Sequence, residues 1–257
     1  MKSGLDTLQG ISNSTLTIVE TLLTNSVPQR ITGKSGVRNK LKKTFKGSYG
    51  QNFTLEIEDQ ELLKEYRKIG KHAITEIISY FINEALYLEP ENLSPKAKQA
   101  IDKLGDNAEK LTKQLRKSSL ADAHEVPIKS EHKVKLRFKK NNNETVTLAE
   151  ITYDTSKSLE AKIAQEDFLI SASIRRFNTN TGNGRLQIED TEHTVAFGFS
   201  ELYKNVASTT KKTLSQNLHQ NNGRPVENWT YLSIRVSPIR RQDGQIVKYI
   251  VRGILDD

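Results

Sequence analysis

The sequence predicts an α+β protein in which a helical hairpin and a basic β-hairpin are followed by a small antiparallel β-barrel. Two observations carry this prediction. In the first half, apolar residues recur every three to four positions, as in helices that pack through one face. From Ile128 the period changes to two, and residues 166–257 hold five alternating segments with one helical segment between the third and the fourth.

The N-terminal elements begin with a helix over residues 14–25, where leucine and valine stand at helical spacing. Residues 38–59 then alternate between apolar and polar side chains, and Gly47 and Gly50 bracket a turn. We therefore expect a two-stranded hairpin that is rich in lysine.

Two long helices are expected next. The first starts at Asp59 and carries apolar residues at helical spacing until Pro90 ends it. The second starts at Ser94, with Pro95 in its first turn, and runs to about Lys117. The short connection between them indicates an antiparallel pair.

In the second half of the chain we expect a further hairpin, whose turn lies at residues 141–143 because three consecutive asparagines favour a turn. A connector of short helix or loop is expected after it. On this basis we assign residues 1–122 to a helix-rich α+β region with the basic hairpin. Residues 123–165 are assigned to a β-hairpin and connector, and residues 166–257 to the barrel.

Three strands, a helix and two strands are the element order of an OB-fold, a five-stranded barrel that often binds oligonucleotides. The stretch SASIRRFNTNTGNGRLQIED, residues 171–190, also resembles the first hairpin of a cold-shock domain, because Phe177-Asn178 precedes a Gly-rich turn. The resemblance implies a barrel. The sequence differs from the cold-shock family at the positions where that family carries base-stacking aromatic residues, since residues 185–187 are Arg, Leu and Gln.

Charge is unevenly distributed along the chain, which carries a net charge of +8. Seven basic residues and no acidic residue lie between Thr21 and Leu55. Such a run attracts phosphate or acidic surfaces over about 8 Å at physiological salt, although a solvated face balanced by the acidic residues from Glu56 onward would look the same. The candidate phosphate contacts are Lys40, Lys42, Lys43 and Lys46 on the first hairpin and Arg175, Arg176 and Arg185 on the late one.

No pattern of catalytic or metal-ligating residues is present in the sequence, and we expect no cofactor. Arg67 and His72 match a loose arginine–histidine signature and so resemble HEPN ribonucleases, which implies RNA cleavage by the pair across a dimer. A match this loose is expected by chance, and Lys68 stands where that family has Asn, Asp or His. Trp229, the single tryptophan, is expected to anchor the core.

The segments LQGISNS and FKGSYGQNFTLEI resemble an uncharacterised bacterial family of the mobile-element and phage-defence type. That resemblance implies a bacterial setting and carries no catalytic residues. We therefore expect a non-enzymatic module that binds nucleic acid, or a nucleic-acid-bound complex, through phosphates. The alternatives are a protein-interaction or oligomerisation scaffold with a protein partner or a second copy, and the HEPN-type ribonuclease. The chain has no cysteine and no run of about 18 apolar residues, which favours a cytoplasmic location without a membrane partner.

Overall fold

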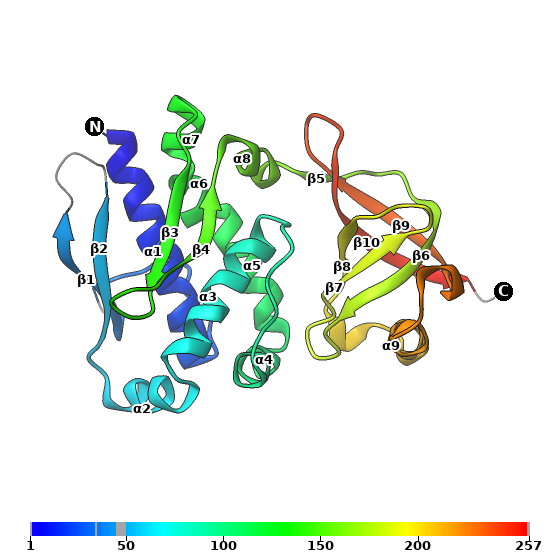
Figure 1. Cartoon of the computed structure of the whole chain (residues 1–257), viewed down its shortest axis with the longest axis horizontal. Coiled ribbons are helices and arrows are strands. Elements are labelled where there is room, and N and C mark those ends of the chain that lie inside the picture. The colour runs from blue at the N-terminus through cyan, green and yellow to red at the C-terminus, as the bar shows by residue number, and fades with distance from the viewer. Residues whose placement is uncertain (1, 34, 45–49, 256–257) are drawn as a thin grey trace. The chain divides into compact units, whose positions relative to one another are not determined.

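A computed structural model of the protein describes residues 2–33, 35–44 and 50–255. The chain divides into two units, Met1–Leu159 and Glu160–Asp257, and each unit has its own hydrophobic core. In Figure 1 the first unit runs from blue to green and the second from yellow-green to red. Helices dominate the first unit and strands dominate the second, so the predicted α+β class is confirmed.

The helices of the first unit surround a core to which α1 contributes along much of its length. Ile18 and Val19 of α1 are fully buried, together with Ile77 and Leu111 from two other helices. The expected helix over residues 14–25 begins twelve residues earlier in the structure, at Lys2. The helices are α1 Lys2–Thr24, α2 Gln60–Ile69, α3 Lys71–Ala85, α4 Pro95–Asp102, α5 Asp106–Lys117, α6 Ser119–Ala123, α7 Glu125–Ser130 and α8 Tyr153–Leu159.

Both long helices expected after the basic hairpin are interrupted at a glycine. Gly70 separates α2 from α3 and has φ 89° and ψ 145°, a conformation that only glycine adopts without strain. Gly105 separates α4 from α5 with φ 50°. The apolar period continues across each break because the flanking helices pack on the same core, so periodicity alone predicts one helix where two exist.

Two β-hairpins complete the first unit. One pairs β1 Val37–Thr44 with β2 Gln51–Ile57, and the other pairs β3 Val134–Lys139 with β4 Thr145–Ile151. The second hairpin contributes Leu136, Leu148 and Ile151 to the first core. Ser79 of α3 donates a hydrogen bond of 2.7 Å from its Oγ to the carbonyl of Leu148. This hairpin therefore packs within the helical unit.

The second unit is a closed barrel of five strands: β6 Phe168–Phe177, β7 Gly184–Ile188, β8 Thr194–Phe199, β9 Leu232–Arg240 and β10 Ile246–Leu255. The strands follow the order β6-β7-β8-β10-β9, and β9 pairs with β6 to close the barrel. The predicted barrel is confirmed. One pairing corrects the expected antiparallel sheet, because β8 and β10 run parallel and the barrel is therefore mixed.

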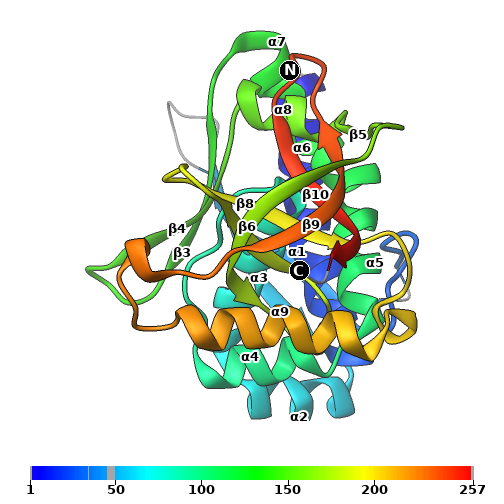
Figure 2. The ribbon, with the colours of Figure 1, turned by 90° about the vertical axis from the view of Figure 1, so that its right-hand side faces the viewer.

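Helix α9, Ser208–Asn221, lies across one end of the barrel, as Figures 1 and 2 both show. Leu214 is fully buried in the barrel core and Leu218 packs against it. The connections include two 3₁₀ turns, Tyr203–Asn205 and Val226–Asn228, and the short strand β5, Lys162–Ile163, pairs with β9. The helix after the third strand was expected from the sequence, and it closes this end of the barrel.

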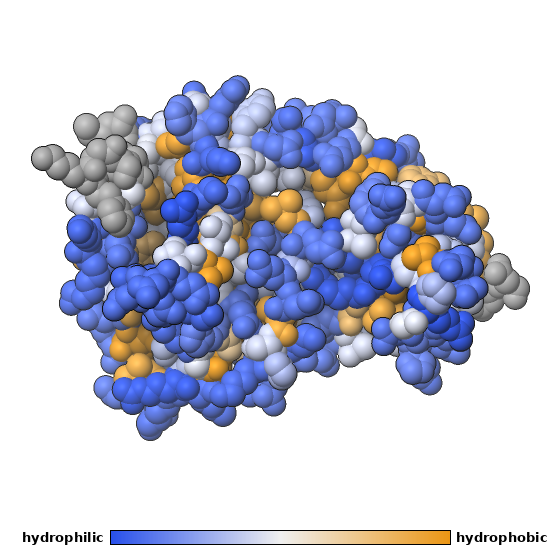
Figure 3. Space-filling model, viewed as in Figure 1, coloured by the Kyte–Doolittle hydropathy of each residue, from blue (hydrophilic) through white to orange (hydrophobic). Residues whose placement is uncertain are grey.

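The surface in Figure 3 is mostly hydrophilic on the face shown, with scattered apolar areas. Within residues 2–33, 35–44 and 50–255, no helix combines the length and the apolar character needed to cross a bilayer.

Candidate nucleic-acid interface

The β1–β2 hairpin positions the lysines that the sequence singles out. Its register places Val37 opposite Ile57 and Leu41 opposite Phe53 on one face. On that face Val37 is fully buried, and Leu55 and Ile57 pack against the first core. Because side chains alternate along a strand, Arg38 and Lys40 point to the opposite face. The hairpin thus has an apolar inner side and a charged outer side.

The base of this outer side is close to neutral. Arg38 forms an ion pair of 3.3 Å with Glu58, and Lys40 forms one of 3.3 Å with Glu56. Both are diagonal cross-strand pairs, since Arg38 lies directly opposite Glu56 and Lys40 opposite Thr54. The balancing carboxylates considered from the sequence therefore neutralise Lys40, the first of the four candidate lysines. Asp59 instead caps α2, where its carboxylate accepts from the amides of Glu61 and Leu62.

The far end of β1 is more strongly cationic. Lys42 and Lys43 are both exposed, and a register shift between Leu41 and Lys43 places Lys42 in a bulge. Lys43 lies opposite Asn52, and the next pair joins Thr44 to Gln51. The fourth candidate, Lys46, lies outside the described residues, as does the turn expected at Gly47.

In the barrel, the adjacent arginines Arg175 and Arg176 lie at an irregularity of β6. The register shifts between Ile174 and Arg176, so that one extra residue is inserted. Core-facing residues stand at even positions from 168 to 174, whereas the next core-facing residue is Phe177. An unbulged strand would point one of the two arginines into the core. The bulge lets both point away from it.

The three barrel arginines have different surroundings. Arg176 lies directly opposite Arg185 on β7 and is half-buried. Arg185 is only 6% exposed, and its Nε and Nη2 donate to the Oγ1 and the carbonyl of Thr194 at 2.8 and 2.9 Å. Arg185 is thus held by its neighbouring strand. Its role as a phosphate contact stays a prediction, one that this burial does not favour.

Arg175, in contrast, is exposed and lies over an aromatic ring. Its Cζ is 4.0 Å from the centre of the Trp229 ring. Trp229 is half-buried outside the barrel core, and its Nε1 donates to the carbonyl of Arg224 at 2.9 Å. The expectation that Trp229 anchors the core is therefore wrong. The connection after α9 brings the ring to the outer side of β6, and the sequence gives no signal for this pairing.

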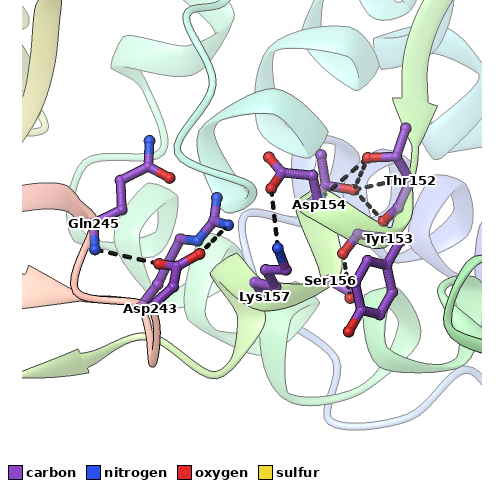
Figure 4. Close-up of polar contacts among 9 residues, drawn as sticks. Thr152, Tyr153, Asp154, Ser156, Lys157, Asp243 and Gln245 are labelled. Carbon is purple, nitrogen blue, oxygen red and sulfur yellow. Dashed lines mark hydrogen bonds and ion pairs between the residues drawn. The ribbon is translucent and has the colours of Figure 1, made fainter.

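The other adjacent arginine pair of the barrel is held by carboxylates. Arg240 forms an ion pair of 2.7 Å with Glu166. Arg241 donates to Asp243 at 2.6 Å, and the same carboxylate accepts from the amide of Gln245 at 3.2 Å in the β9–β10 turn (Figure 4). The same turn contains Gly244, which has φ 86°.

Arg67 and His72, the candidate catalytic pair of the HEPN-ribonuclease alternative, lie on two different helices. Arg67 is on α2, and His72 follows the break at Gly70 on α3. The His72 ring lies edge-on to Phe138, with 6.3 Å between ring centres. Among the described residues, no hydrogen bond or ion pair joins Arg67 to His72, and no group of three acidic, histidine or cysteine side chains could hold a metal ion.

His124 is buried and contacts hydrogen-bonding groups through both ring nitrogens. It is fully buried, with Nδ1 2.6 Å from the carbonyl of Leu120 and Nε2 2.8 Å from the Oγ1 of Thr155. That hydroxyl belongs to the first turn of α8, where Thr152 Oγ1 accepts from the Thr155 amide and Ser156 Oγ donates to the Tyr153 carbonyl (Figure 4). His124 therefore joins α6 to the start of α8.

The chain matches no protein-family model, no curated protein and no solved structure at a significant level.

Proposed function

We propose that this protein is a non-enzymatic module that binds nucleic acid, or a complex already bound to nucleic acid, through phosphate contacts. The observation that carries the proposal is the far end of β1. There Lys42 and Lys43, two adjacent lysines, are both exposed. Lysine is a compact charge on a flexible stem and suits contact with phosphates along a backbone.

The hairpin also supports this proposal through its shape. Its inner face is anchored on the helical core through Leu55 and Ile57, so the outer face is held away from the core. The ion pairs of Arg38 and Lys40 partly neutralise the base of the hairpin, and the exposed Lys42 and Lys43 lie beyond it. An extended anion would then be attracted to the hairpin end before it meets the rest of the unit.

A mobility-shift titration at low salt tests the proposal. The double variant Lys42→Gln/Lys43→Gln is expected to bind duplex DNA or RNA about tenfold more weakly, because two charge-assisted contacts are lost. The matched control is Lys64→Gln/Lys68→Gln on α2, where each lysine already pairs with a glutamate three residues away at 2.7 and 3.4 Å. This control removes the same charge and is expected to bind like the wild type. Equal loss in both variants, or no shift with any nucleic acid, contradicts the proposal.

A second candidate is a protein-interaction or oligomerisation scaffold. Leu41 favours it, since this leucine is 54% exposed beside the half-buried Phe53 on the partner strand. Light scattering on the purified chain separates the two functions. A defined oligomer that carries no nucleic acid, and that Leu41→Ser converts to a monomer, would support the scaffold.

A bacterial setting in phage defence and a cytoplasmic location belong to the same proposal. They rest on the resemblance of the two quoted segments and on the composition of the chain. Neighbouring genes test the setting, because a module without its own chemistry acts together with partners encoded nearby.

A further inference from the structure

Arg175 and Trp229 form a fixed pair on the outside of the barrel. The guanidinium carbon lies 4.0 Å from the ring centre, the arginine is exposed, and the indole is half-buried. The hydrogen bond from the indole Nε1 to the carbonyl of Arg224 fixes the orientation of the ring. The ring thus supports one side of the guanidinium group, in the manner of a cation–π contact.

A buried asparagine sets the spacing of this pair. Asn217 of α9 is 2% exposed, and its Oδ1 accepts from the amide of Ile174, the residue before Arg175, at 2.8 Å. Its Nδ2 donates to the carbonyl of Thr230, the residue after Trp229, at 2.9 Å. One side chain therefore ties together the two backbone segments that carry the pair.

A second asparagine strengthens the same connection. Asn221, one helical turn after Asn217 and also 2% exposed, donates to Ser173 Oγ at 2.9 Å and accepts from the amide of Thr230 at 2.9 Å. The pair is consequently built into the barrel. A ligand that uses it does not have to order two free side chains first.

The segment of the chain that supplies Trp229 is rich in basic residues. Helix α9 contains Lys211, Lys212 and His219 and no acidic residue. Arg224 follows the helix, and Glu227 is the one carboxylate between residues 202 and 242. Residues 202–242 therefore carry more positive than negative charge, which favours the phosphates on either side of a bound base.

We propose that Arg175, supported by Trp229, is a stacking site for one base of a single-stranded nucleic acid. Unpaired bases stack on aromatic rings and on guanidinium planes, largely without regard to sequence, whereas the bases of a duplex are covered by their neighbours. This inference rests on the proposed function and adds a preference for single strands. The exposed guanidinium receives the base, and the indole holds the guanidinium in place.

Trp229 is the single tryptophan of the chain, so its fluorescence reports on this site alone. The full-length protein is titrated with a thymidine oligomer and with an abasic oligomer of the same length. The thymidine oligomer is expected to change the fluorescence and to bind at least about fivefold more tightly, since stacking strengthens binding by about that factor or more. The abasic oligomer, with the same phosphates, is expected to leave the fluorescence unchanged.

Arg175→Lys keeps the charge and the reporter and removes the planar group. This variant is expected to lose the preference for the thymidine oligomer and to bind the abasic oligomer and duplex DNA as the wild type does. The matched control is Arg235→Lys, which alters an exposed arginine of the same barrel on β9 and is expected to keep the preference.

The outcomes separate this inference from the proposed function. An equal fluorescence change with the abasic oligomer, or an unchanged preference in Arg175→Lys, overturns the stacking site. Binding in the mobility shift that depends on Lys42 and Lys43, without any response of Trp229, overturns the stacking site and leaves the proposed function standing. If neither assay detects any nucleic acid, both are wrong.

Discussion

His124 couples the stability of the helical unit to pH. Burial lowers the pKa of His124 below its ordinary value of 6.5, because the charged imidazolium would lose its water, while the hydrogen bond to Leu120 acts in the opposite direction. As the pH falls through 6.5, the unfolded chain therefore takes up this proton more readily than the folded chain. It follows that this group stabilises the folded state above pH 6.5 and that the contribution is lost as the pH falls.

Urea unfolding at about pH 7.5 and about pH 5.5 measures this effect. The wild type is expected to lose stability toward acid by up to about 1.4 kcal/mol per pH unit more than His124→Gln, which cannot take up the proton. His219→Gln, at an exposed position of α9, serves as the control and should follow the wild type. Parallel pH dependence in the wild type and His124→Gln would show that His124 takes up a proton equally in both states.

Asn217 links the two backbone segments that carry Arg175 and Trp229. Asn217→Ala leaves the buried amide of Ile174 without its acceptor, whereas the carbonyl of Thr230 keeps a bond of 2.8 Å from Asn221. One unsatisfied buried group costs about 1–3 kcal/mol. The free energy of unfolding should fall by that amount, measured by chemical denaturation. Gln216→Ala on the exposed side of α9 should change it by less than about 0.5 kcal/mol, and an equal loss in both variants would contradict the assigned role.

The arginine pair shows what the sequence can predict for single residues. Two adjacent arginines in an alternating segment identify Arg175 and Arg176 as candidate contacts. The outward direction of both depends on a bulge, and the residue before the bulge donates its amide to an asparagine more than forty residues away. The sequence predicts Trp229 as a core anchor, yet the ring lies half-buried against Arg175 outside the barrel core. Such long-range contacts have no local signature.

Helices α1 and α6 approach each other closely at Gly10. A Cβ added to this residue would lie 2.3 Å from the amide nitrogen of Ala123 and 2.6 Å from the carbonyl oxygen of Ser119. Ser14, one turn later, donates to Ser119 Oγ at 2.9 Å across the same crossing. The small residues of α1 therefore allow the two backbones to lie in contact.

Gly10→Ala is expected to destabilise the protein by about 1–3 kcal/mol or more, because backbone atoms of α6 would have to move. The midpoint of thermal or chemical unfolding measures the loss. Gly33→Ala is the matched control, since a Cβ there meets no atom within 4 Å and the backbone needs no positive φ. If the two substitutions have the same effect, the close crossing does not determine the packing of α1.

The charged hairpin was predictable as an element and only partly as a site. Alternation and the run of basic residues predict two strands and a lysine-rich face. Which lysines are neutralised depends on the register, because Glu56 and Glu58 reach Lys40 and Arg38 diagonally across the strands. The sequence offers several registers, and a shift by one residue would exchange the two faces.

At the scale of the whole molecule, the order of elements predicts the barrel, and the structure confirms it. The order of elements does not predict that β8 and β10 run parallel. A barrel with a helix between its third and fourth strands can close in more than one way. The glycine breaks at Gly70 and Gly105 are likewise missed, since the apolar period runs through both. Local pattern predicts elements well, and their closure into two cores depends on contacts far apart in the chain.

The proposed function requires the end of the β1–β2 hairpin to neutralise phosphates, and the salt dependence of binding measures how many phosphates are neutralised. The logarithm of the binding constant for duplex DNA falls with the logarithm of salt concentration by about 0.9 per phosphate neutralised. We predict that Lys42→Gln/Lys43→Gln reduces this slope by about 1.8, two phosphates at 0.9 each, while Lys64→Gln/Lys68→Gln leaves it unchanged. A slope that is the same in the wild type and both double variants would contradict the claim.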